Sequence, residues 1–309
     1  KWAQDLDQEI FTGSSGRVFP KSMKASPLLR SWLIRLSNKG VTFYRNWKWV
    51  GWQDDVAAFE TISGKKFVKS HTTVLAMGGA SWPHLGSDGL WADILKKSNV
   101  NITNFQPSNM GFKVQWSDFM KPFFGTPIKS VRISSGEFSA IGEFVISKKG
   151  IEGSGIYAAS KFLRDGNSLM IDLLPDTEIE TLNKRQKLLS LKVSRSTLNR
   201  KVLRLNKGKT AFFNEFSQHI STQNIVHAAK NLLIPHEGPH PINEAISTAG
   251  GVSESALNDN LMLKAKPSIF CAGEMLDWEA PTGGYLISAC LATGKWAGLG
   301  AVNYIKSLK

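Results

Sequence analysis

The chain has 309 residues, of which 42% are hydrophobic, and a formal net charge of +13. This length suits about two domains, and the apolar content suffices for a packed core. No apolar stretch reaches the ~18 residues that a membrane-spanning helix needs, and two cysteines, Cys271 and Cys290, form neither a disulfide framework nor a metal-ligand set. These features exclude a membrane-embedded or disulfide-rich protein and favour a reducing, cytoplasmic setting.

The first regular element expected is a helix over residues 24–39. Ser26 can cap it, Pro27 suits a first turn, and Gly40 closes it. Its apolar residues fall on one helical face: Leu28, Leu29, Trp32, Leu33 and Leu36.

The next stretch alternates aromatic and polar residues, which predicts a small antiparallel meander. Its strands are expected over residues 41–52, 57–61 and 66–70. The clustered tryptophans of this region (Trp32, Trp47, Trp49 and Trp52) are interpreted as packing residues rather than ligand-stacking ones.

Residues 72–77 read as a buried strand that runs into Gly78 and Gly79, and residues 89–97 as the following helix. From about Gln106 the sequence changes to short strand-like runs separated by turn residues, which predicts a β-barrel or sandwich. These runs cover residues 112–116, 128–133, 137–146 and 169–173, with a loop and a helix over 150–164.

A basic helical segment follows Pro175 and extends to about Leu233. Between Lys184 and Lys209 lie ten cations and no acid, which leaves +3 for the rest of the chain. A solvated outer face is one explanation of this cluster; attraction of a polyanion, or steering of an anionic substrate or nicotinamide cofactor, is the other. The stretch lacks the interleaved aromatic residues that single-stranded nucleic acid uses for stacking. Residues 235–241, with three prolines, are the expected linker.

The C-terminal region reads as a buried strand over 268–272, an acidic loop, and a helix from Gly284 to Ala297 opened by Gly283 and Gly284. A helix that begins there directs free backbone N–H groups and the positive end of its dipole at a pyrophosphate or at the N1/O2 edge of a flavin. Glu274 can accept hydrogen bonds from ribityl or ribose hydroxyls. An ordinary strand-turn-helix corner remains the alternative.

Four passages resemble a known family, in the expected order. They are Gly13–Pro20 running on to Arg30, Gly78–Gly89, Glu244–Val252 and Cys271–Gly294. They resemble the bacterial flavoprotein family of NAD(FAD)-utilizing dehydrogenases, or aminoacetone oxidase-like proteins.

The resemblance implies an α/β fold, α+β overall, with FAD as cofactor. The implied architecture is a Rossmann-like FAD domain in two parts, residues 1–104 and 241–309, with a β-barrel-like domain over 105–174 and a basic helical domain over 175–240 inserted between them.

The resemblance also implies the residues around the cofactor. Arg17 would place positive charge beside the flavin or else form an ion pair with a nearby carboxylate, and the glycines would admit backbone close to the dinucleotide. The full implied set is Arg17, Val18, Phe19, Gly78, Gly79, Ser81, Trp82, Pro83, Gly86, Ser87, Thr248, Gly250, Gly251, Gly273, Glu274, Asp277, Gly283, Gly284, Tyr285 and Leu286.

One feature of the family is missing from this sequence. Family members open with a strand, a G-x-G-x-x-G turn and a helix, whereas the glycines near Gly13, Gly78, Gly153 and Gly283 all fail that spacing. We therefore expect a truncated FAD domain that lacks its N-terminal βαβ unit, which puts FAD binding by this chain alone in doubt.

Three functional hypotheses follow. The first is an FAD-dependent oxidoreductase acting on a small molecule, with NAD(P)H as an electron donor and no metal; the sequence identifies no catalytic acid or base, since Glu279, Tyr285 and His84 qualify only through expected nearness to the ring. The second is a flavoprotein that binds or modifies nucleic acid through the Lys184–Lys209 segment. The third is a half-protein that folds poorly. The oligomeric state stays open.

Overall fold

The computed structural model describes residues 1–13, 16–189 and 193–309, and these residues divide into two compact units, Lys1–Thr73 and Val74–Lys309. Each unit is described by itself. None of the described helices combines the length and the apolarity that crossing a membrane requires.

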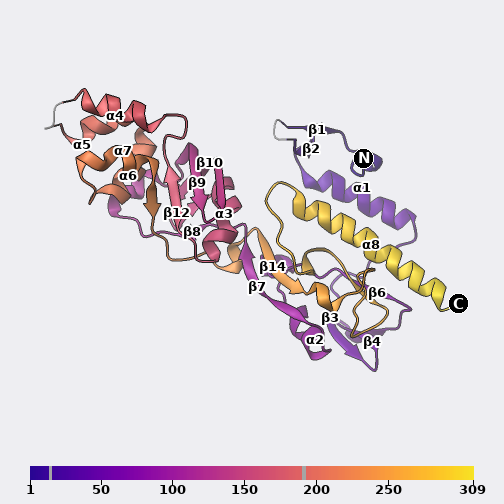
Figure 1. Ribbon diagram of the computed structural model, residues 1–309. Coiled ribbons are helices and arrows are strands. Elements are labelled where there is room, and N and C mark those ends of the chain that lie inside the picture. The colour runs from indigo at the N-terminus through magenta and orange to yellow at the C-terminus, as the bar shows by residue number, and fades with distance from the viewer. Residues whose placement is uncertain (14–15, 190–192) are drawn as a thin grey trace. The chain divides into compact units, whose positions relative to one another are not determined.

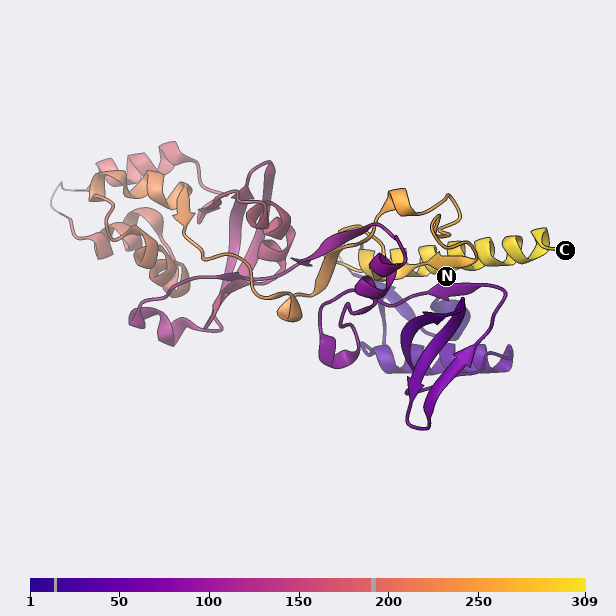
Figure 2. The ribbon, with the colours of Figure 1, turned by 90° about the horizontal axis from the view of Figure 1, so that it is seen from below.

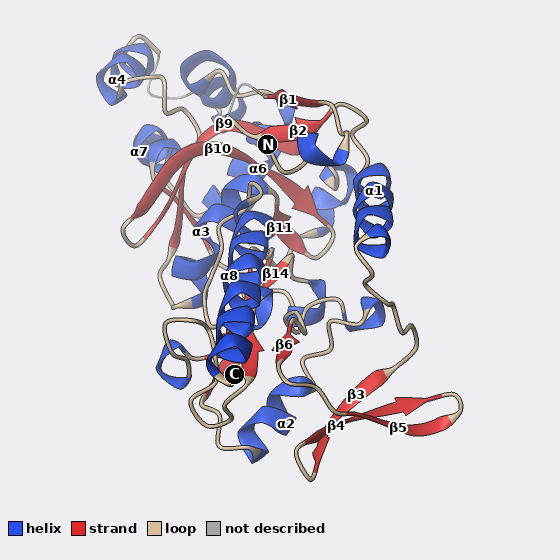
Figure 3. Cartoon of the chain, turned by 90° about the vertical axis from the view of Figure 1, so that its right-hand side faces the viewer, coloured by secondary structure: helices blue, strands red, loops and turns tan. Residues whose placement is uncertain are grey.

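The first unit contains the predicted helix and the predicted meander (Figure 3). Strands β3, β4 and β5 pair in that order, with antiparallel registers. The bounds in this unit are η1 Gln4–Leu6, β1 Ile10–Thr12, β2 Val18–Pro20, α1 Ala25–Asn38, β3 Lys48–Gln53, β4 Val56–Thr61 and β5 Gly64–Val68.

Two details of this unit correct the sequence interpretation. Helix α1 begins at Ala25 after an extended Lys24, so Ser26 lies inside the first turn and caps nothing. Pro27 permits this start because the first-turn N–H groups of a helix have no partner anyway. The strand expected from Val41 begins only at Lys48, because Asn46 has a left-handed φ of 60° that interrupts the extended chain.

The tryptophans of this unit pack against aromatic neighbours, as expected. Trp49 is buried and meets Trp52 edge-on, with ring centroids 4.8 Å apart. Trp47 lies between Tyr44 and Phe59, and Trp32 meets Trp2 edge-on.

The second unit contains the predicted glycine loops, which connect short strands and helices (Figure 1). Strands β6 and β15 pair with each other, and β7 pairs antiparallel with β14. The bounds are β6 Thr73–Leu75, η2 Pro83–Leu85, α2 Trp91–Lys97, β7 Ile102–Ser108, η6 Ile242–Glu244, β14 Ser247–Val252, η7 Glu254–Ala256, β15 Ile269–Cys271, η8 Gly273–Met275 and α8 Tyr285–Ser307. Helix α8 is long (Figure 2, yellow), and extends ten residues beyond its predicted end.

The segment predicted to be barrel-like contains five strands of one six-stranded antiparallel sheet, whose order is β13-β12-β9-β10-β11-β8. The sixth strand, β13 Leu232–Ile234, comes from the basic segment. Helix α3 packs on β9 and β10. The strands that residues 112–116 and 137–146 predict are β8, which is shorter than expected, and β10. The bounds are β8 Phe112–Lys113, η3 Asp118–Phe123, β9 Pro127–Ser135, β10 Phe138–Ser147, β11 Gly150–Glu152, α3 Ser154–Arg164 and β12 Leu169–Asp172.

The described part of the basic segment forms short helices joined by turns up to Lys230, after which β13 adds an edge strand to the same sheet. Sheet and helices share one hydrophobic core, in which Phe112, Phe144, Phe212 and Phe213 are fully buried. The bounds are α4 Ile179–Lys187, α5 Arg195–Leu198, a π-helical turn η4 Asn199–Leu203, α6 Lys207–Ser217, η5 Thr222–Asn224, α7 Ile225–Lys230 and β13 Leu232–Ile234.

The proline-rich stretch expected to be a linker is held along the chain next to β8. Lys113 donates its backbone N–H to the Gly238 carbonyl and accepts from Glu237, and His240 N–H donates to Gly111. The backbone donors that a mobile linker would leave to water are therefore satisfied by this neighbouring stretch.

Candidate functional site

The first part of the site is the loop that follows β6. Gly78 has a left-handed φ of 72°, which glycine adopts without strain, and its carbonyl accepts a 3.1 Å hydrogen bond from the buried Trp91 indole. Trp82 also has a positive φ, of 60°, and directly precedes the 3₁₀ turn that begins at Pro83. A positive φ at a bulky residue is uncommon, so the surroundings of this loop impose the conformation.

Two side chains fasten this loop to β14 and η8. The Thr248 hydroxyl accepts hydrogen bonds from the N–H groups of Ala80, at 2.9 Å, and Ser81, at 3.2 Å. The Glu274 carboxylate accepts from Gly79 N–H at 3.3 Å and from Thr248 N–H at 3.0 Å. Loops that are about 170 and 195 positions apart in sequence therefore meet at Thr248 and Glu274.

The predicted glycines divide into two groups by what surrounds them. Gly79, Gly250 and Gly251 lie against protein: a Cβ on Gly79 would come 2.6 Å from the Thr248 Cβ, and one on Gly251 would come 2.9 Å from the Met275 carbonyl carbon. Their close backbone approach is to neighbouring loops. In contrast, a Cβ on Gly86 or Gly284 would meet no atom within 4 Å, although both residues have left-handed φ values.

These observations test whether a dinucleotide cofactor fits. The Ser87 hydroxyl is buried without a hydrogen-bond partner among the described residues, and it lies 3.4 Å from the position of a Cβ on Gly78. Buried hydroxyls in folded proteins normally have a partner, so Ser87 retains a donor and an acceptor for a bound group. Glu274 also retains accepting lone pairs beyond its two backbone donors. The residues present fit a polar ligand such as FAD.

Helix α8 begins directly after Gly283 and Gly284, as the sequence predicts. Gly284 is its N-cap, with a φ of 91°, and Tyr285 at the first helical position is 60% exposed. The helix connects to η8 further along, where Thr293 accepts from Gly273 N–H at 3.0 Å and where Cys290 lies beside Gly273. Leu286 is half-buried. The turns of α8 around Cys290 and Thr293 thus contact the loop at η8, whereas nothing lies where a Cβ on Gly284 would stand.

The acidic loop between η8 and α8 is fixed at three points. Thr103 donates to the Asp277 carboxylate at 2.5 Å, and Asp277 N–H donates to the Val252 carbonyl. Glu279 forms a two-pronged ion pair with Arg164 of α3, at 2.9 and 3.0 Å. Asn109 donates to the Ala280 carbonyl at 2.7 Å.

Arg164 and its partners were not identified from the sequence. Arg164 is about as buried as a core residue, and its guanidinium also donates to the Pro107 carbonyl at 2.9 Å. Burial acts against its charged form, but the Glu279 carboxylate more than offsets this, so the pKa of Arg164 is raised. The two residues of this ion pair are 115 positions apart in sequence. No local sequence pattern predicts a contact over that separation. Glu279, considered as an acid or base, is engaged in this ion pair.

Arg17, Val18 and Phe19 lie in the first unit, so their proximity to a cofactor stays a prediction. Val18 and Phe19 belong to β2, and Phe19 stacks on Phe11 of β1 with ring centroids 5.7 Å apart. Arg17 precedes the strand and forms no ion pair with the described residues. Ser14 and Ser15 of the same motif lie outside the described residues.

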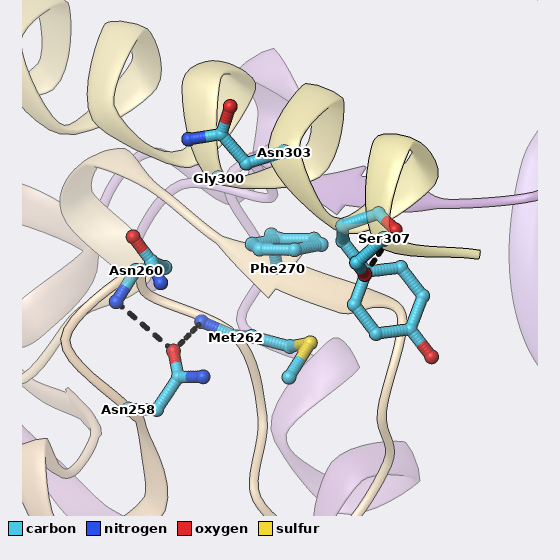
Figure 4. Close-up of a pocket in the computed structure, with 8 residues that line it drawn as sticks. Asn258, Asn260, Met262, Phe270, Gly300, Asn303 and Ser307 are labelled. Atoms are coloured by element: carbon cyan, nitrogen blue, oxygen red, sulfur yellow. Dashed lines mark hydrogen bonds between the residues drawn. The ribbon is translucent and has the colours of Figure 1, made fainter. Parts of the chain in front are cut away.

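A separate pocket of about 230 Å³ lies at the far end of α8 (Figure 4). Phe270, Met262, Asn258 and Asn260 form one side, and α8 supplies Gly300, Asn303, Tyr304 and Ser307. Gly300 is ~24 Å along the helix from Gly284, given the 1.5 Å rise per residue. This pocket is therefore distinct from the loop system that Thr248 and Glu274 hold together.

The basic segment presents a set of cations, here called the cationic surface. Six are exposed and pair with no described carboxylate: Lys184, Lys187, Arg200, Lys201, Arg204 and Lys207. Three others are used inside the fold, because Arg185, Arg195 and Lys209 donate to backbone carbonyls. Lys192, the tenth cation, and Leu191 lie outside the described residues.

The remaining titratable groups offer no metal site: the described residues contain no group of three or more His, Cys, Asp or Glu that could hold an ion. Cys271 is fully buried, which raises the pKa of its thiol to about 12, and burial also raises the pKa of Cys290. Both are therefore thiols at neutral pH.

The short strands, the glycine loops that meet at Thr248 and Glu274, and the helices that follow them form a mixed α/β fold. The sequence matches the family model described as the HI0933-like protein Rossmann domain over residues 1–300. Because this match covers nearly the whole chain, the protein belongs to the HI0933-like Rossmann-domain family, whose members are FAD-binding flavoproteins.

Two curated proteins are similar in sequence. A 3-dehydro-bile acid delta(4,6)-reductase of Clostridium scindens is 23% identical over 318 residues, which cover 95% of this chain and 78% of that protein. A ribosomal RNA dihydrouridine synthase of Escherichia coli is 23% identical over 225 residues, or 69% of this chain. That match spans 56% of the synthase, so the chain accounts for about half of its length.

Two solved structures also align with the chain. One is the open conformation of a flavocytochrome c3 fumarate reductase, with a TM-score of 0.44 and 16% identity over 98% of this chain and 61% of that one. The other is Sdh1 of Mycobacterium smegmatis in complex with UQ1, with a TM-score of 0.41 and 12% identity over 98% of this chain and 53% of that one. The family assignment depends on the family model alone.

Proposed function

We propose that the protein is an FAD-dependent oxidoreductase that acts on a small molecule. The observation that carries this proposal is the meeting of the residue-78, residue-248 and residue-274 loops at Thr248 and Glu274, beside the unpartnered Ser87 hydroxyl. When bound, FAD supplies the hydride-transfer chemistry, and the protein supplies binding, orientation and electrostatics.

The residues of this chain would divide those tasks. Ser87 would hydrogen-bond the cofactor, and Gly86 and Gly284 would allow its close approach because nothing lies where a Cβ would stand. The α8 N-terminus would favour the negative charge of a pyrophosphate or of the flavin N1/O2 edge. Glu274 would orient a ribityl or ribose hydroxyl while it fixes Gly79 and Thr248.

A small molecule as substrate is supported by the similar protein that is named a bile-acid reductase. We propose NADH or NADPH as the electron donor. The test is an absorption spectrum of the purified protein after incubation with FAD, followed by anaerobic titration with each nicotinamide. We expect a flavin band at ~450 nm that NADH or NADPH bleaches. Failure of the complete protein to take up FAD would refute the proposal.

A second function, binding of nucleic acid, is favoured by one observation. The six exposed residues of the cationic surface lack carboxylate partners among the described residues, and the other similar protein is named for ribosomal RNA. Cations without protein partners are available to phosphates, whose neutralisation releases counterions.

Salt dependence distinguishes the two functions. If the cationic surface contacts RNA, the logarithm of the affinity falls linearly with the logarithm of the salt concentration, and the triple variant Arg200→Gln/Lys201→Gln/Arg204→Gln lowers that slope by roughly 1 per lost phosphate contact. The matched control neutralises Lys96 and Lys97, two exposed cations of α2. Equal RNA affinity of wild type and triple variant would exclude this role for the surface.

A further inference from the structure

We propose that Arg164, together with Glu279, is a positioning residue that holds the N-terminal end of α8 in the geometry FAD binding requires. This inference rests on the proposed function. It begins from the ion pair between α3, a helix packed on the six-stranded sheet, and the loop that leads into α8.

The geometry of this pair is well defined. Both guanidinium Nη atoms donate to separate Glu279 oxygens, at 2.9 and 3.0 Å, and Ser108 donates to Glu279 Oε1 at 2.8 Å. The Arg164 side chain is only 10% exposed and that of Glu279 only 20%. A two-pronged arginine–carboxylate contact fixes orientation as well as distance.

Surrounding hydrogen bonds complete an anchor on β7 and β14. Arg164 donates to the Pro107 carbonyl, and the Asn109 side chain donates to both the Ala280 carbonyl and the Ser247 hydroxyl, each at 2.7 Å. Ala280 itself is 3% exposed. The chain is therefore immobilised at Glu279 and Ala280.

Only four residues, 281–284, separate this anchor from the first residue of α8. Three of them, Pro281, Gly283 and Gly284, are exposed. Gly283 and Gly284 have φ values of 117° and 91° that few other residues adopt. Because so short a connection transmits the position of Ala280, breaking the Arg164–Glu279 pair would release the start of α8.

Another buried ion pair in the same unit serves as a matched control. Lys230 of α7 contacts Asp172 of β12 at 2.7 Å, with side chains 15% and 13% exposed. It resembles the Arg164–Glu279 pair in burial but joins elements of the sheet and the basic helices. Loss of the arginine or of the lysine leaves a largely buried carboxylate, Glu279 or Asp172, without its ion-pair partner and lowers stability.

The test compares Arg164→Met, Glu279→Gln and Lys230→Met in the complete protein. We expect Arg164→Met to weaken FAD binding at least tenfold and to change the visible circular dichroism of the FAD-saturated protein. Glu279→Gln, which keeps the Ser108 hydrogen bond, should weaken binding severalfold, and Arg164→Lys should restore only part of the loss because an ammonium cannot form the two-pronged contact. Lys230→Met should lower the thermal midpoint while FAD binding stays within twofold.

Hydrogen exchange without cofactor tests the anchor separately. Amides of residues 277–288 should exchange at least fivefold faster in Arg164→Met than in wild type. In Lys230→Met the exchange rates of the same amides should equal those of wild type. Unchanged exchange of this segment in Arg164→Met would overturn the proposed anchoring, whatever the protein binds. Equal losses of FAD affinity in the arginine and lysine variants would overturn the link to the cofactor, and a wild type that binds no FAD would refute the oxidoreductase proposal itself.

Discussion

The hydroxyl of Thr248 is shared by two consecutive backbone amides, those of Ala80 and Ser81. Both donors belong to the loop after β6, and Thr248 is 3% exposed, so no water replaces a lost acceptor easily. The hydroxyl thus keeps the glycine loop against β14, and its removal tests how far that loop depends on a single acceptor.

Replacing Thr248 with valine, which has nearly the same shape, should cost ~1–3 kcal/mol because the buried Ser81 N–H and the half-buried Ala80 N–H lose their acceptor. FAD affinity should fall with it. Urea unfolding and FAD titration measure the two effects. Thr248→Ser keeps the hydroxyl and is the control; a valine variant as stable as the serine variant would show that the loop does not depend on this contact.

Burial of Cys271 has a consequence at high pH. In the folded protein, the pKa of the Cys271 thiol is raised to about 12. In the unfolded chain the thiol ionises at its ordinary pKa, so ionisation favours the unfolded state once the pH exceeds that ordinary pKa. The stabilising contribution is complete below about pH 9 and is lost as the pH rises toward 12. We expect the unfolding free energy to decline over this range, and the decline to be shallower in Cys271→Ala, as followed by denaturant titration at several pH values.

The same burial predicts chemical inertness at neutral pH. A thiol reagent at pH 8 should leave Cys271 unmodified in the native protein and modify it in urea, because only the thiolate reacts. Rapid modification of native Cys271, read by mass spectrometry, would contradict its burial.

At the scale of single elements, α8 depends on the backbone conformation that opens it. Gly284 has a φ of 91°, where a side chain with a branched Cβ is strained although space is available. We expect Gly284→Val to cost ~1–2 kcal/mol and to lower FAD retention. Gly284→Asn is the control because asparagine tolerates left-handed φ. Both variants are compared by thermal unfolding and by flavin content after gel filtration; equal retention would place the cofactor elsewhere.

Elements with local periodicity could be predicted from the sequence. The apolar face of α1, the alternation in β3 and the glycine-opened α8 all depend on neighbouring residues. The strand β7 could not be predicted, since it contains Pro107 and mostly polar residues, and its partner β14 lies some 140 residues away. Its pairing depends on tertiary contacts rather than on its own pattern.

In the candidate site, too, features that depend on neighbouring residues could be predicted from the sequence, whereas contacts between distant segments could not. The helix start after Gly283 and Gly284 was predicted, because the signal for it is local, and both glycines have the left-handed φ values that glycine adopts without strain. The partners of Thr248 and Glu274, and the Arg164–Glu279 pair, depend on which distant segments meet. The sequence also could not show that Gly79 and Gly251 pack against protein.

At the scale of the whole molecule, a bound cofactor links binding to stability. A ligand that binds only the native state at a hundred times its dissociation constant stabilises that state by ~2.7 kcal/mol. Added FAD should therefore raise the thermal midpoint of the protein, and riboflavin, which lacks the pyrophosphate and adenosine, should raise it less. Calorimetry at matched ligand concentrations measures the two shifts of the thermal midpoint. Identical shifts with FAD and riboflavin would argue against a pyrophosphate at the α8 start.

The positive charge of the molecule is concentrated in one part of the chain. Most of its +13 comes from one segment, whereas the loops at Thr248 and Glu274 carry acidic residues and no lysine or arginine. A cationic surface built on helices apart from those loops can be altered without disturbing them. The proposed binding of a polyanion and the proposed binding of FAD should thus be separable by mutation.

The pairing of β7 with β14 is irregular at one point. Ala249 faces Gln106, but Gly251 faces Thr103, so β7 has one residue more than its partner in this interval. Asn104 and Phe105 together lie opposite Gly250, and a Cβ on Gly250 would collide with the Asn104 carbonyl. Since successive residues of a strand point to opposite faces, deleting Asn104 would reverse the side on which Thr103 projects. The Thr103 hydroxyl would then lose its hydrogen bond to the Asp277 carboxylate. Deletion of one residue, more than 170 positions earlier in the sequence, would therefore remove one of the three contacts that fix the acidic loop between η8 and α8.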